Sequence, residues 1–317
     1  MSVKSPGSVS RGVWLGAHIG ISDGFDRAPV IGREIGCEAI QIFSKSPQMW
    51  KGVPIPVEAA ERFRRAVVEQ GLKATAVHHG YLLNLANPKD GPRKQSLLTL
   101  VDELQRAGLL GVNDLIIHPG AHLGSGVEPG IDLIAQGLNA ALNEVPDGRV
   151  RILLENAAGQ GTTIGSTFAE LRSILDKVEQ RARVGVTLDT CHLFAAGIDI
   201  RGPEAYGAMI DQLEADLGVA EVHAFHLNDA QGELGSHLDR HENIGQGSIG
   251  LEGFGPFVRD ARWANVPGYL ETPLDDRGYS RYEKDLRQLR STLAPVLRAR
   301  PKSRSPRPRS VRATMAK

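Results

Sequence analysis

Between residues 78 and 271 the chain carries nine side chains of two types that commonly bind metal ions. Five are histidines and four are acidic: His78, His118, Glu155, Asp189, His192, His226, Asp239, His241 and Glu271. Imidazole and carboxylate ligands together suit zinc or manganese, so metal-dependent chemistry is the first function to consider. Each residue alone is weak evidence, because a single histidine at a strand end usually makes structural hydrogen bonds.

The nine residues lie at or shortly after the ends of short apolar runs, and amphipathic stretches separate these runs. The runs cover residues 13–19, 39–43, 74–78, 114–120, 151–156, 184–189, 222–227 and 269–272. Nearly continuous apolar runs indicate strands buried on both faces, as in parallel sheets. Eight strand–helix pairs in one series predict an α/β fold, a single (β/α)8 TIM barrel with its metal site at the C-terminal face of the strands.

The stretches between the runs carry helix signals. Residues 56–71 end at a C-cap glycine, and residues 96–111 have apolar positions at helical spacing. Residues 166–180 open with Ser166 or Thr167 as the N-cap and have Glu170 placed for a capping box. A doubly wound open sheet is the structural alternative, but no GxGxxG follows the first run, which weighs against its dinucleotide-binding form.

In a TIM barrel the C-terminal strand ends form one face, so the nine residues are expected to converge at one mouth. Four carboxylates in one pocket would repel each other and lose hydration, and cations resolve this conflict. Nine ligands exceed the needs of one ion, so two or three ions are implied. Three divalent ions would carry +6 against −4 from the carboxylates, which leaves a positive pocket suited to phosphate. Asp239 and His241 lie two residues apart and can bind one ion together from an extended segment. Cys191 is interpreted as a small buried apolar residue rather than a thiolate ligand.

Composition sets broad limits on the class of protein. Of 317 residues, 41% are hydrophobic, which is enough for a large core, and 37 basic residues balance 37 acidic ones. Two cysteines argue against a disulfide framework and fit a reducing compartment. The first residues lack the apolar segment of a secretory signal, and no run approaches a membrane span. We therefore expect a soluble, cytoplasmic protein without a membrane partner, associated with the nucleoid if the protein is bacterial.

Charge is unevenly distributed, because residues 297–317 hold eight basic residues and no acidic one. Pro, Ser and Arg without apolar periodicity predict a disordered tail. Such a tail could bind DNA through counterion release, or could serve only as a solubilising extension. The expected organisation is a disordered extension over 1–11, a barrel domain over 12–296 and the basic tail over 297–317.

The motifs that carry the nine residues resemble the endonuclease IV family of apurinic/apyrimidinic (AP) endonucleases, and the resemblance covers residues 12–296. The motifs are LGAHIG (15–20), VHHGYLLNLA (77–86), IHPGAH (117–122), LLENAAGQG (153–161), VGVTLDTCHLFAAGIDI (184–200), FHLNDAQGELGSHLDRHENIGQGSIG (225–250) and YLET (269–272). The resemblance implies a TIM-barrel DNA-repair enzyme with three Zn²⁺ ions, some of them replaceable by Mn²⁺. Such an enzyme hydrolyses the phosphodiester 5′ to an abasic site and leaves a 3′-hydroxyl and a 5′-deoxyribose phosphate.

The same resemblance implies how the ligands are shared among three ions. One ion takes His78, His118 and Glu155, and Glu155 bridges to a second ion that also takes Asp189, His226 and Glu271. The third ion takes His192, Asp239 and His241. Glu155 is expected to orient or deprotonate the attacking water. The implied partner is double-stranded DNA with abasic sites or blocked 3′ ends, bound by a monomer.

Some positions depart from the family pattern or match its DNA contacts. Tyr81 matches a residue that the family places in the DNA helix. Gln48 stands where arginine is expected, and the missing positive charge is predicted to weaken DNA affinity or alter how the strand is wedged. His79 stands where an acidic residue is expected and is predicted to face solvent, with a contact to phosphate as the alternative.

Other polar residues near the motifs have weaker assignments. His18 is interpreted as lying near the ligands or the phosphate, with a purely structural role as the alternative. Asn228 and Asp229 are predicted to orient ligands through hydrogen bonds. We expect no metal at three further histidines: His122, His223 and His237.

Two other functions compete with a nuclease. A sugar isomerase or epimerase on a similar barrel would use one divalent ion and only Glu155, Asp189, His226 and Glu271. The five additional ligand-type residues favour the nuclease. The second alternative is a damage-binding protein that no longer cuts, and the intact ligand set argues against it.

Overall fold

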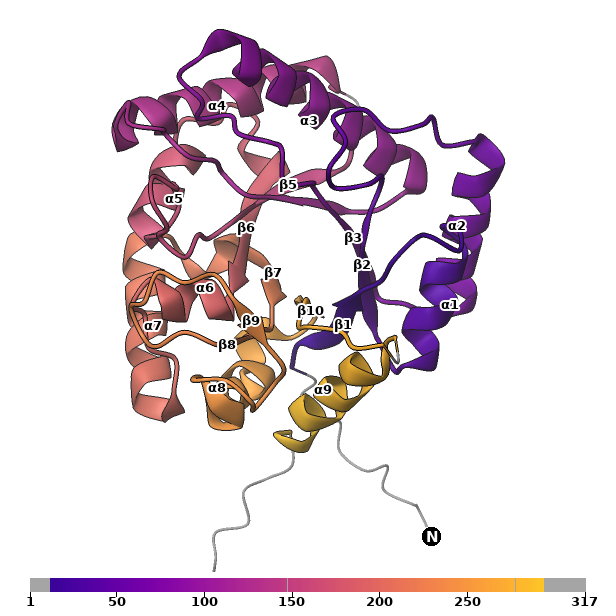
Figure 1. Ribbon diagram of the computed structural model, residues 1–317, viewed down its shortest axis with the longest axis vertical. Coiled ribbons are helices and arrows are strands. Elements are labelled where there is room, and N and C mark those ends of the chain that lie inside the picture. The colour runs from indigo at the N-terminus through magenta and orange to yellow at the C-terminus, as the bar shows by residue number, and fades with distance from the viewer. Residues whose placement is uncertain (1–11, 147, 277, 294–317) are drawn as a thin grey trace, which may run out of the picture.

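The computed structural model describes residues 12–146, 148–276 and 278–293. Within this part of the chain, eight parallel strands close into a barrel and most of the helices lie outside it (Figure 1). The order around the barrel is β1-β10-β7-β6-β5-β4-β3-β2, so barrel strands that follow one another along the chain are neighbours in space. This arrangement confirms the predicted TIM barrel and excludes the open sheet.

The strands closely match the apolar runs. Their bounds are β1 Trp14–His18, β2 Ala39–Phe43, β3 Ala74–His78, β4 Asp114–Ile117, β5 Arg151–Glu155, β6 Val184–Asp189, β7 Val222–His226 and β10 Pro267–Leu270. Two short strands, β8 (Asp229–Ala230) and β9 (His241–Glu242), form an antiparallel pair outside the barrel. Strands β4 and β10 end one residue before His118 and Glu271, so these two side chains lie at the first residue past a strand.

The helices lie mainly between the strands, and each of the three stretches expected to be helical contains or overlaps one of them. Their bounds are α1 Arg27–Glu34, α2 Val57–Glu69, α3 Asp90–Leu110, α4 Val127–Glu144, α5 Phe168–Leu175, α6 Thr190–Ala195, α7 Gly202–Asp216, α8 Gly250–Arg259 and α9 Ser280–Ser291. None of the helices in the described part of the chain is long and apolar enough to cross a membrane.

A local signal explains where α5 starts. At α5 the Thr167 side chain accepts a hydrogen bond from the Glu170 N–H at 3.2 Å, and the Glu170 carboxylate accepts one from the Ser166 N–H at 3.0 Å. Thr167 is thus the N-cap, and Glu170 reaches back as in a capping box, although it accepts from the residue before the N-cap and not from Thr167 itself. Helix α3 starts at Asp90, earlier than expected, so its polar first turn is helical as well.

The barrel interior is layered because alternate residues of each strand point inward. Its middle layer is apolar and fully buried, and consists of Ala39, Ala76, Ile116, Leu153, Ala224 and Tyr269. The next inward position towards the C-terminal end on four of the strands is Gln41, His78, Glu155 or His226. The apolar layer therefore forms the floor on which the polar mouth of the barrel rests.

The opposite end of the barrel holds a second, smaller polar group. Asp114 and Arg151 form an ion pair at 2.9 Å, and both line a pocket together with His223. Burial, followed by the positive charge of Arg151, lowers the pKa of His223 to about 4. In the folded protein the His223 imidazole is therefore neutral above about pH 4.

Replacing His223 by glutamine is expected to make unfolding less sensitive to acid. The folded-state pKa of about 4 lies below the ordinary value of 6.5, so the unfolded state binds a proton first as the pH falls. As the pH falls from 6.5 to 4, His223 therefore lowers the free energy of unfolding. The loss is on the order of 1–2 kcal/mol after allowance for partial solvent exposure. Urea unfolding of both proteins at pH 7, 5.5 and 4 measures this difference, and parallel stability curves would contradict it.

Residues 1–11 and 294–317 lie outside the described residues. The expected disordered extension and the basic tail over 297–317 therefore stay predictions, as do the exact domain limits.

Candidate active site

The nine ligand-type side chains come together at the C-terminal end of the barrel. Four of them are the last residues of β3, β5, β6 and β7, three follow a barrel strand, Asp239 lies between β8 and β9, and His241 is the first residue of β9. Together with His18 and Tyr81, most of them line a pocket of about 530 Å³. The ligand atoms fall into small groups in which all atoms lie within 4.8 Å of one another.

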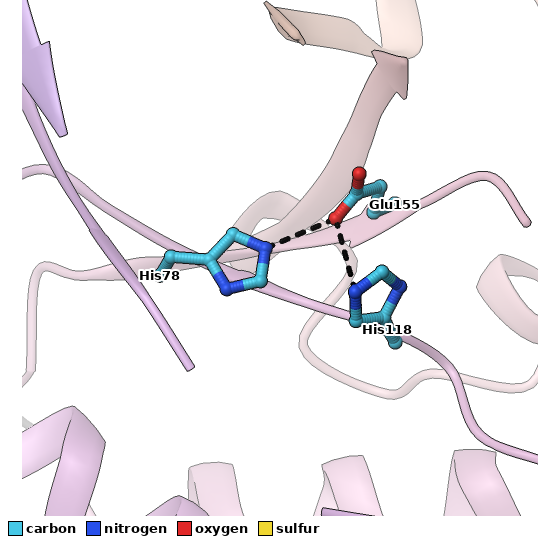
Figure 2. A group of neighbouring side chains, drawn as sticks. All are labelled: His78, His118 and Glu155. Carbon is cyan, nitrogen blue, oxygen red and sulfur yellow. Dashed lines mark hydrogen bonds and ion pairs between the residues drawn. The ribbon is translucent and has the colours of Figure 1, made fainter. Parts of the chain in front are cut away.

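The first group consists of His78, His118 and Glu155 (Figure 2). Both imidazoles point at the same carboxylate oxygen, with His78 Nε2 3.1 Å and His118 Nε2 3.7 Å from Glu155 Oε2. The Glu155 carboxylate is almost fully buried, with 1% of its side chain exposed. Two nitrogen donors and one oxygen therefore surround a point where a cation could bind.

The second group shares Glu155 and adds Asp189, His226 and Glu271. His226 Nδ1 lies 2.8 Å from Glu155 Oε1, 3.5 Å from Glu271 Oε2 and 3.9 Å from Asp189 Oδ2. The two oxygens of Glu155 thus face different groups, Oε2 the first and Oε1 the second. This is the geometry that a carboxylate needs in order to bridge two ions.

The third group consists of His192, Asp239 and His241. Asp239 Oδ1 lies 3.2 Å from His192 Nε2 and 3.4 Å from His241 Nε2. The antiparallel pair β8–β9 returns the chain to the barrel mouth, because Ala230 pairs with His241. This pairing brings the end of the loop back beside His192 on α6.

Four of the five histidines have one ring nitrogen bound to an oxygen acceptor. The acceptors are the carbonyls of His79 for His78 at 2.7 Å, Asn156 for His192 at 2.8 Å and Glu271 for His241 at 3.2 Å, and the Gln41 side-chain oxygen for His226 at 2.8 Å. The other nitrogen of each ring faces carboxylates. For His192 and His241 that nitrogen, Nε2, is buried and makes no hydrogen bond to a described residue. This is how histidines are held when they bind metal, so the residues present fit a cation cluster.

Electrostatics point the same way. Burial acts to lower the pKa of His226, but the carboxylates of Glu271 and Glu155 outweigh it and raise the pKa to about 9. Burial is likewise outweighed at His241, mainly by Asp189 and Asp239, and its pKa also rises to about 9. Burial would raise the pKa of Glu155, whereas His226 and His118 hold it well below its usual range. The pocket therefore stabilises positive charge and keeps this carboxylate ionised.

Asn228 holds two of the acidic residues, Asp189 by its side chain and Glu271 by its backbone, as predicted. Its fully buried side-chain amide donates to Asp189 Oδ2 at 2.7 Å and accepts from the Glu271 N–H at 2.8 Å. Asp189 also caps α6, because its Oδ1 accepts from the His192 N–H at 2.9 Å. Asp189 is thereby held by backbone and side-chain donors in one orientation.

Asp229 organises the loop that follows β9 rather than touching a ligand-type side chain. Its two carboxylate oxygens accept hydrogen bonds at 2.9–3.3 Å from five backbone N–H groups, those of Ala230, Gly245, Gly247, Ile249 and Gly250. A Cβ atom at Gly247 would lie 2.3 Å from the Ala230 carbonyl oxygen, so only glycine allows this approach. The segment 243–250 is therefore wrapped around one buried charge.

Replacing Asp229 by asparagine is expected to destabilise the protein by about 3 kcal/mol. An amide has one oxygen acceptor, so the N–H groups now bound to the second carboxylate oxygen would be left buried and unpaired. Urea unfolding at a fixed metal concentration measures the change, with the exposed Asp23→Asn as a control for the same chemical substitution. A loss below about 1 kcal/mol would show that the loop does not depend on this charge.

The loops after β2 and β3 are held together at the rim of the pocket. The Tyr81 N–H donates to the Pro47 carbonyl at 3.1 Å, and the Tyr81 side chain is 68% exposed. Gln48 is exposed on the neighbouring loop, next to the exposed Met49 and Trp50. The structure thus places both predicted DNA-contact residues on one exposed ridge beside the pocket.

A buried ionic network, which the motifs do not reveal, anchors this ridge to α3. Lys45 Nζ lies 2.8 Å from Asp102 and 3.0 Å from Glu103, and the Ser44 hydroxyl donates to Glu103 at 2.5 Å. Arg106 donates to Ser44 Oγ at 2.9 Å. Because these charges are paired in a buried position, they restrict the path of the loop that carries Gln48.

The expectation that His79 faces solvent is wrong. Its side chain is buried, with 3% of the residue exposed, and its Nδ1 donates to the Gly80 carbonyl at 2.6 Å. Burial lowers the pKa of His79 to about 4, and the opposing charge of Glu103 only partly offsets this effect.

The other secondary assignments can be placed in the same way. Cys191 is fully buried, as predicted, and its Sγ lies 3.6 Å from the Arg240 carbonyl oxygen, although it is also within 4.8 Å of ligand atoms of Asp189 and His241. Burial raises the pKa of its thiol, which disfavours a thiolate. His18 lines the pocket, with Nδ1 3.5 Å from Glu271 Oε1.

One residue at the centre of the site was missed in the sequence. Gln41 is fully buried and contacts His18, His226 and Glu271. The available signal was a single polar residue in the otherwise apolar run AIQIF, at an inward-facing position of its strand.

Fold and site together define a TIM-barrel protein with clustered metal-ligand side chains at the C-terminal mouth of its barrel. The sequence pattern of a family described as xylose isomerase-like TIM barrels matches residues 31–292. A protein named probable endonuclease 4 from Chloroflexus aurantiacus is 42% identical over 259 residues, which are 82% of this chain and 91% of that protein. Its namesake from Halorhodospira halophila is also 42% identical, over 84% of this chain and 90% of its own length. The chain belongs to the endonuclease IV family of AP endonucleases.

Solved structures agree with this assignment. The crystal structure of endonuclease IV from Thermus thermophilus superposes with a TM-score of 0.78 and 32% sequence identity, and covers 88% of this chain and 98% of that chain. A D-tagatose 3-epimerase-like protein superposes with a TM-score of 0.67 but only 18% identity, over 88% of this chain and 97% of its own. The second likeness concerns the fold alone.

Proposed function

We propose that the chain is a DNA-repair endonuclease that hydrolyses the phosphodiester 5′ to an abasic site. Its products are a 3′-hydroxyl and a 5′-deoxyribose phosphate, and blocked 3′ ends are a second class of substrate. The observation that supports the proposal is the meeting of all nine ligand-type side chains in overlapping groups at the barrel mouth, where seven of them line one pocket. The proposal also rests on family membership, because the relatives named above are endonucleases.

The three groups have the membership expected for three Zn²⁺ ions. His78, His118 and Glu155 would hold one, Glu155, Asp189, His226 and Glu271 a second, and His192, Asp239 and His241 a third. Nitrogen and carboxylate oxygen donors suit Zn²⁺, and Mn²⁺ accepts the same donors at some sites. When bound, such ions supply Lewis-acid stabilisation of phosphoryl charge and lower the pKa of a coordinated water from ~15.7 towards ~7.

Glu155 is the residue of this chain proposed to act on the attacking water. Its carboxylate is ionised and nearly fully buried, and each of its oxygens faces a different ligand group. An ionised carboxylate in that position can accept a hydrogen bond from water and turn the oxygen lone pair towards phosphorus. None of the described geometry requires a covalent nucleophile.

Tyr81 and Gln48 are proposed DNA contacts. A half-exposed apolar ridge beside the pocket can enter the space left by a missing base, as apolar wedges do in other DNA-bending proteins. Tyr81 at 68% exposure and the neighbouring Met49 and Trp50 supply that ridge. Gln48 contributes an uncharged amide, so this ridge adds little to the salt-dependent attraction between the protein and the DNA phosphates.

The sugar isomerase remains the competing function, since its single-ion set corresponds to the second group. The group formed by His192, Asp239 and His241 has no task in such an enzyme. Its presence, and that of His78 and His118, favours the nuclease.

A labelled duplex with one abasic-site analogue tests the proposal directly. The zinc-loaded protein is expected to cut it once, 5′ to the site, and to leave an undamaged duplex of the same sequence intact. Binding without cutting would favour a damage-binding protein. Absence of both binding and cutting by fully metallated protein would reject the nuclease, and turnover of a ketose or aldose would then support the isomerase.

We also propose that the basic segment 298–317 raises DNA affinity. Deleting it is expected to weaken binding and to reduce the slope of log K against log salt by at least about 2, because phosphate contacts release counterions. A full-length variant with the eight basic residues changed to glutamine keeps the chain length and should behave like the deletion. An unchanged slope in both proteins would reject this role.

A further inference from the structure

The polar mouth of the barrel contains one neutral amide among charged side chains. Gln41 lies on β2, is fully buried and directs its side chain at three groups, those of His18 on the neighbouring strand β1, His226 on β7 and Glu271 after β10. Its Oε1 lies 2.8 Å from His226 Nε2, and its Nε2 lies 2.6 Å from Glu271 Oε1 and 2.9 Å from His18 Nδ1. Both amide hydrogens and the carbonyl oxygen are therefore used.

An amide oxygen only accepts hydrogen bonds and an amide nitrogen only donates them. The contact with Gln41 Oε1 therefore requires a hydrogen on His226 Nε2. When the His226 ring is neutral, its lone pair must then lie on Nδ1. That nitrogen faces Glu155 Oε1 at 2.8 Å and Glu271 Oε2 at 3.5 Å, inside the second ligand group.

The same amide constrains Glu271. Gln41 Nε2 occupies Glu271 Oε1, whereas Glu271 Oε2 is the oxygen directed at His226 Nδ1. The Gln41 amide thus holds one oxygen of the Glu271 carboxylate, and the other oxygen faces the second ligand group. Asn228 fixes the backbone of Glu271 independently.

His18 completes the arrangement from β1. Its Nδ1 accepts the second Gln41 hydrogen, and its ring packs on Phe43 with the centroids 4.3 Å apart. Because the ring is held by packing, the amide of Gln41 cannot rotate without losing a buried hydrogen bond, which costs about 1–3 kcal/mol.

We propose that Gln41 is a positioning residue for one cation, the one held by Glu155, Asp189, His226 and Glu271. Its amide selects the His226 tautomer that offers Nδ1 and turns one Glu271 oxygen towards the same point. This inference rests on the proposed function only in assuming that the group binds a cation. It adds a residue on β2, a strand that supplies none of the nine ligands.

The test compares Gln41→Met with wild-type protein in a metal titration. Apoprotein is titrated with Zn²⁺ against a chromophoric chelator, and Cd²⁺-loaded protein is examined by ¹¹³Cd NMR, which resolves each bound ion. Methionine fills a similar volume without a donor or a hard acceptor. We expect affinity for one ion to fall about 10–100-fold, and one ¹¹³Cd resonance to shift or broaden while the others stay.

Two further variants separate positioning from general damage. Gln41→Glu keeps an acceptor for His226 but loses the donor to Glu271, so it should weaken the same ion. Thr187→Val is the matched control, because the Thr187 hydroxyl is also buried inside the barrel but has no hydrogen-bond partner among the described residues. It should leave all affinities unchanged.

The inference is overturned if Gln41→Met binds every ion as wild type does. It is also overturned if all ions weaken equally while the apoprotein melts at a lower temperature, which would indicate a structural role. These outcomes are independent of the proposed function, whose failure would be seen as wild-type protein that binds its ions without cutting abasic DNA.

Discussion

Replacing Glu155 by glutamine is expected to reduce cleavage of abasic DNA by about 10³-fold or more, which corresponds to about 4 kcal/mol of activation free energy. The two carboxylate oxygens of Glu155 belong to different ligand groups, and the side chain is almost fully buried. Glutamine has nearly the same shape, but only one of its polar atoms can accept a hydrogen bond or bind a cation. The substitution therefore removes the negative charge that the two ligand groups share and the acceptor that would hold the water.

Single-turnover cleavage of the abasic duplex measures the loss, and binding of the same duplex is measured in parallel. DNA affinity should change little, because the exposed ridge around Tyr81 is untouched. Glu233→Gln is the matched control, since Glu233 is exposed in the segment between β8 and β9 and belongs to no ligand group. Cleavage by Glu155→Gln within tenfold of wild type would remove Glu155 from the reaction.

Removing divalent cations is expected to abolish cleavage and to destabilise the fold. A ligand at about 1,000 times its Kd stabilises the folded state by about 4 kcal/mol per site, so loss of several tightly bound ions has a large effect. In the ion-free protein, protons on His226 and His241 take over part of the neutralisation of the carboxylates. This replacement is incomplete, because four carboxylates then share a buried pocket with imidazoles alone.

Thermal unfolding before and after chelation tests this expectation, with metal content determined on the same samples. The melting temperature should fall by roughly 10 °C or more and should recover when Zn²⁺ is added back, together with cleavage. Restoration by Mn²⁺ would show that some sites accept either ion. A chelated protein with bound metal below one ion per chain and unchanged melting and cleavage would contradict a catalytic metal centre.

The loop residues differ from the ligand residues in how far each could be predicted. Tyr81 and Gln48 could be named from their motif, but their exposure and mutual position depend on the contact between the loops after β2 and β3. That contact depends on α3. Its Glu103 binds both Ser44 and Lys45, and its Arg106 donates to Ser44. Pairing between residues so far apart in the sequence has no local signature.

The sequence by itself determined the barrel and the side of it on which chemistry takes place. Apolar runs of strand length separated by amphipathic helices allow few folds, and in a closed parallel barrel every strand ends on the same face. Residues such as Glu155 and Asp189, each at the end of a run, were therefore bound to meet. The nine imidazole and carboxylate side chains then predicted that the site binds metal cations.

Tertiary structure alone decided which nitrogen of each histidine faces the pocket, and which neutral groups hold the ligands. His226 is turned by Gln41, which lies 185 positions away in the chain, and Glu271 is held by the same amide from 230 positions away. His79 is buried near Glu103 of α3 and Lys45, a position that its departure from the family pattern did not predict. A hydrogen bond depends on distances of a few tenths of an ångström between strands, and those distances exist only once the barrel has closed.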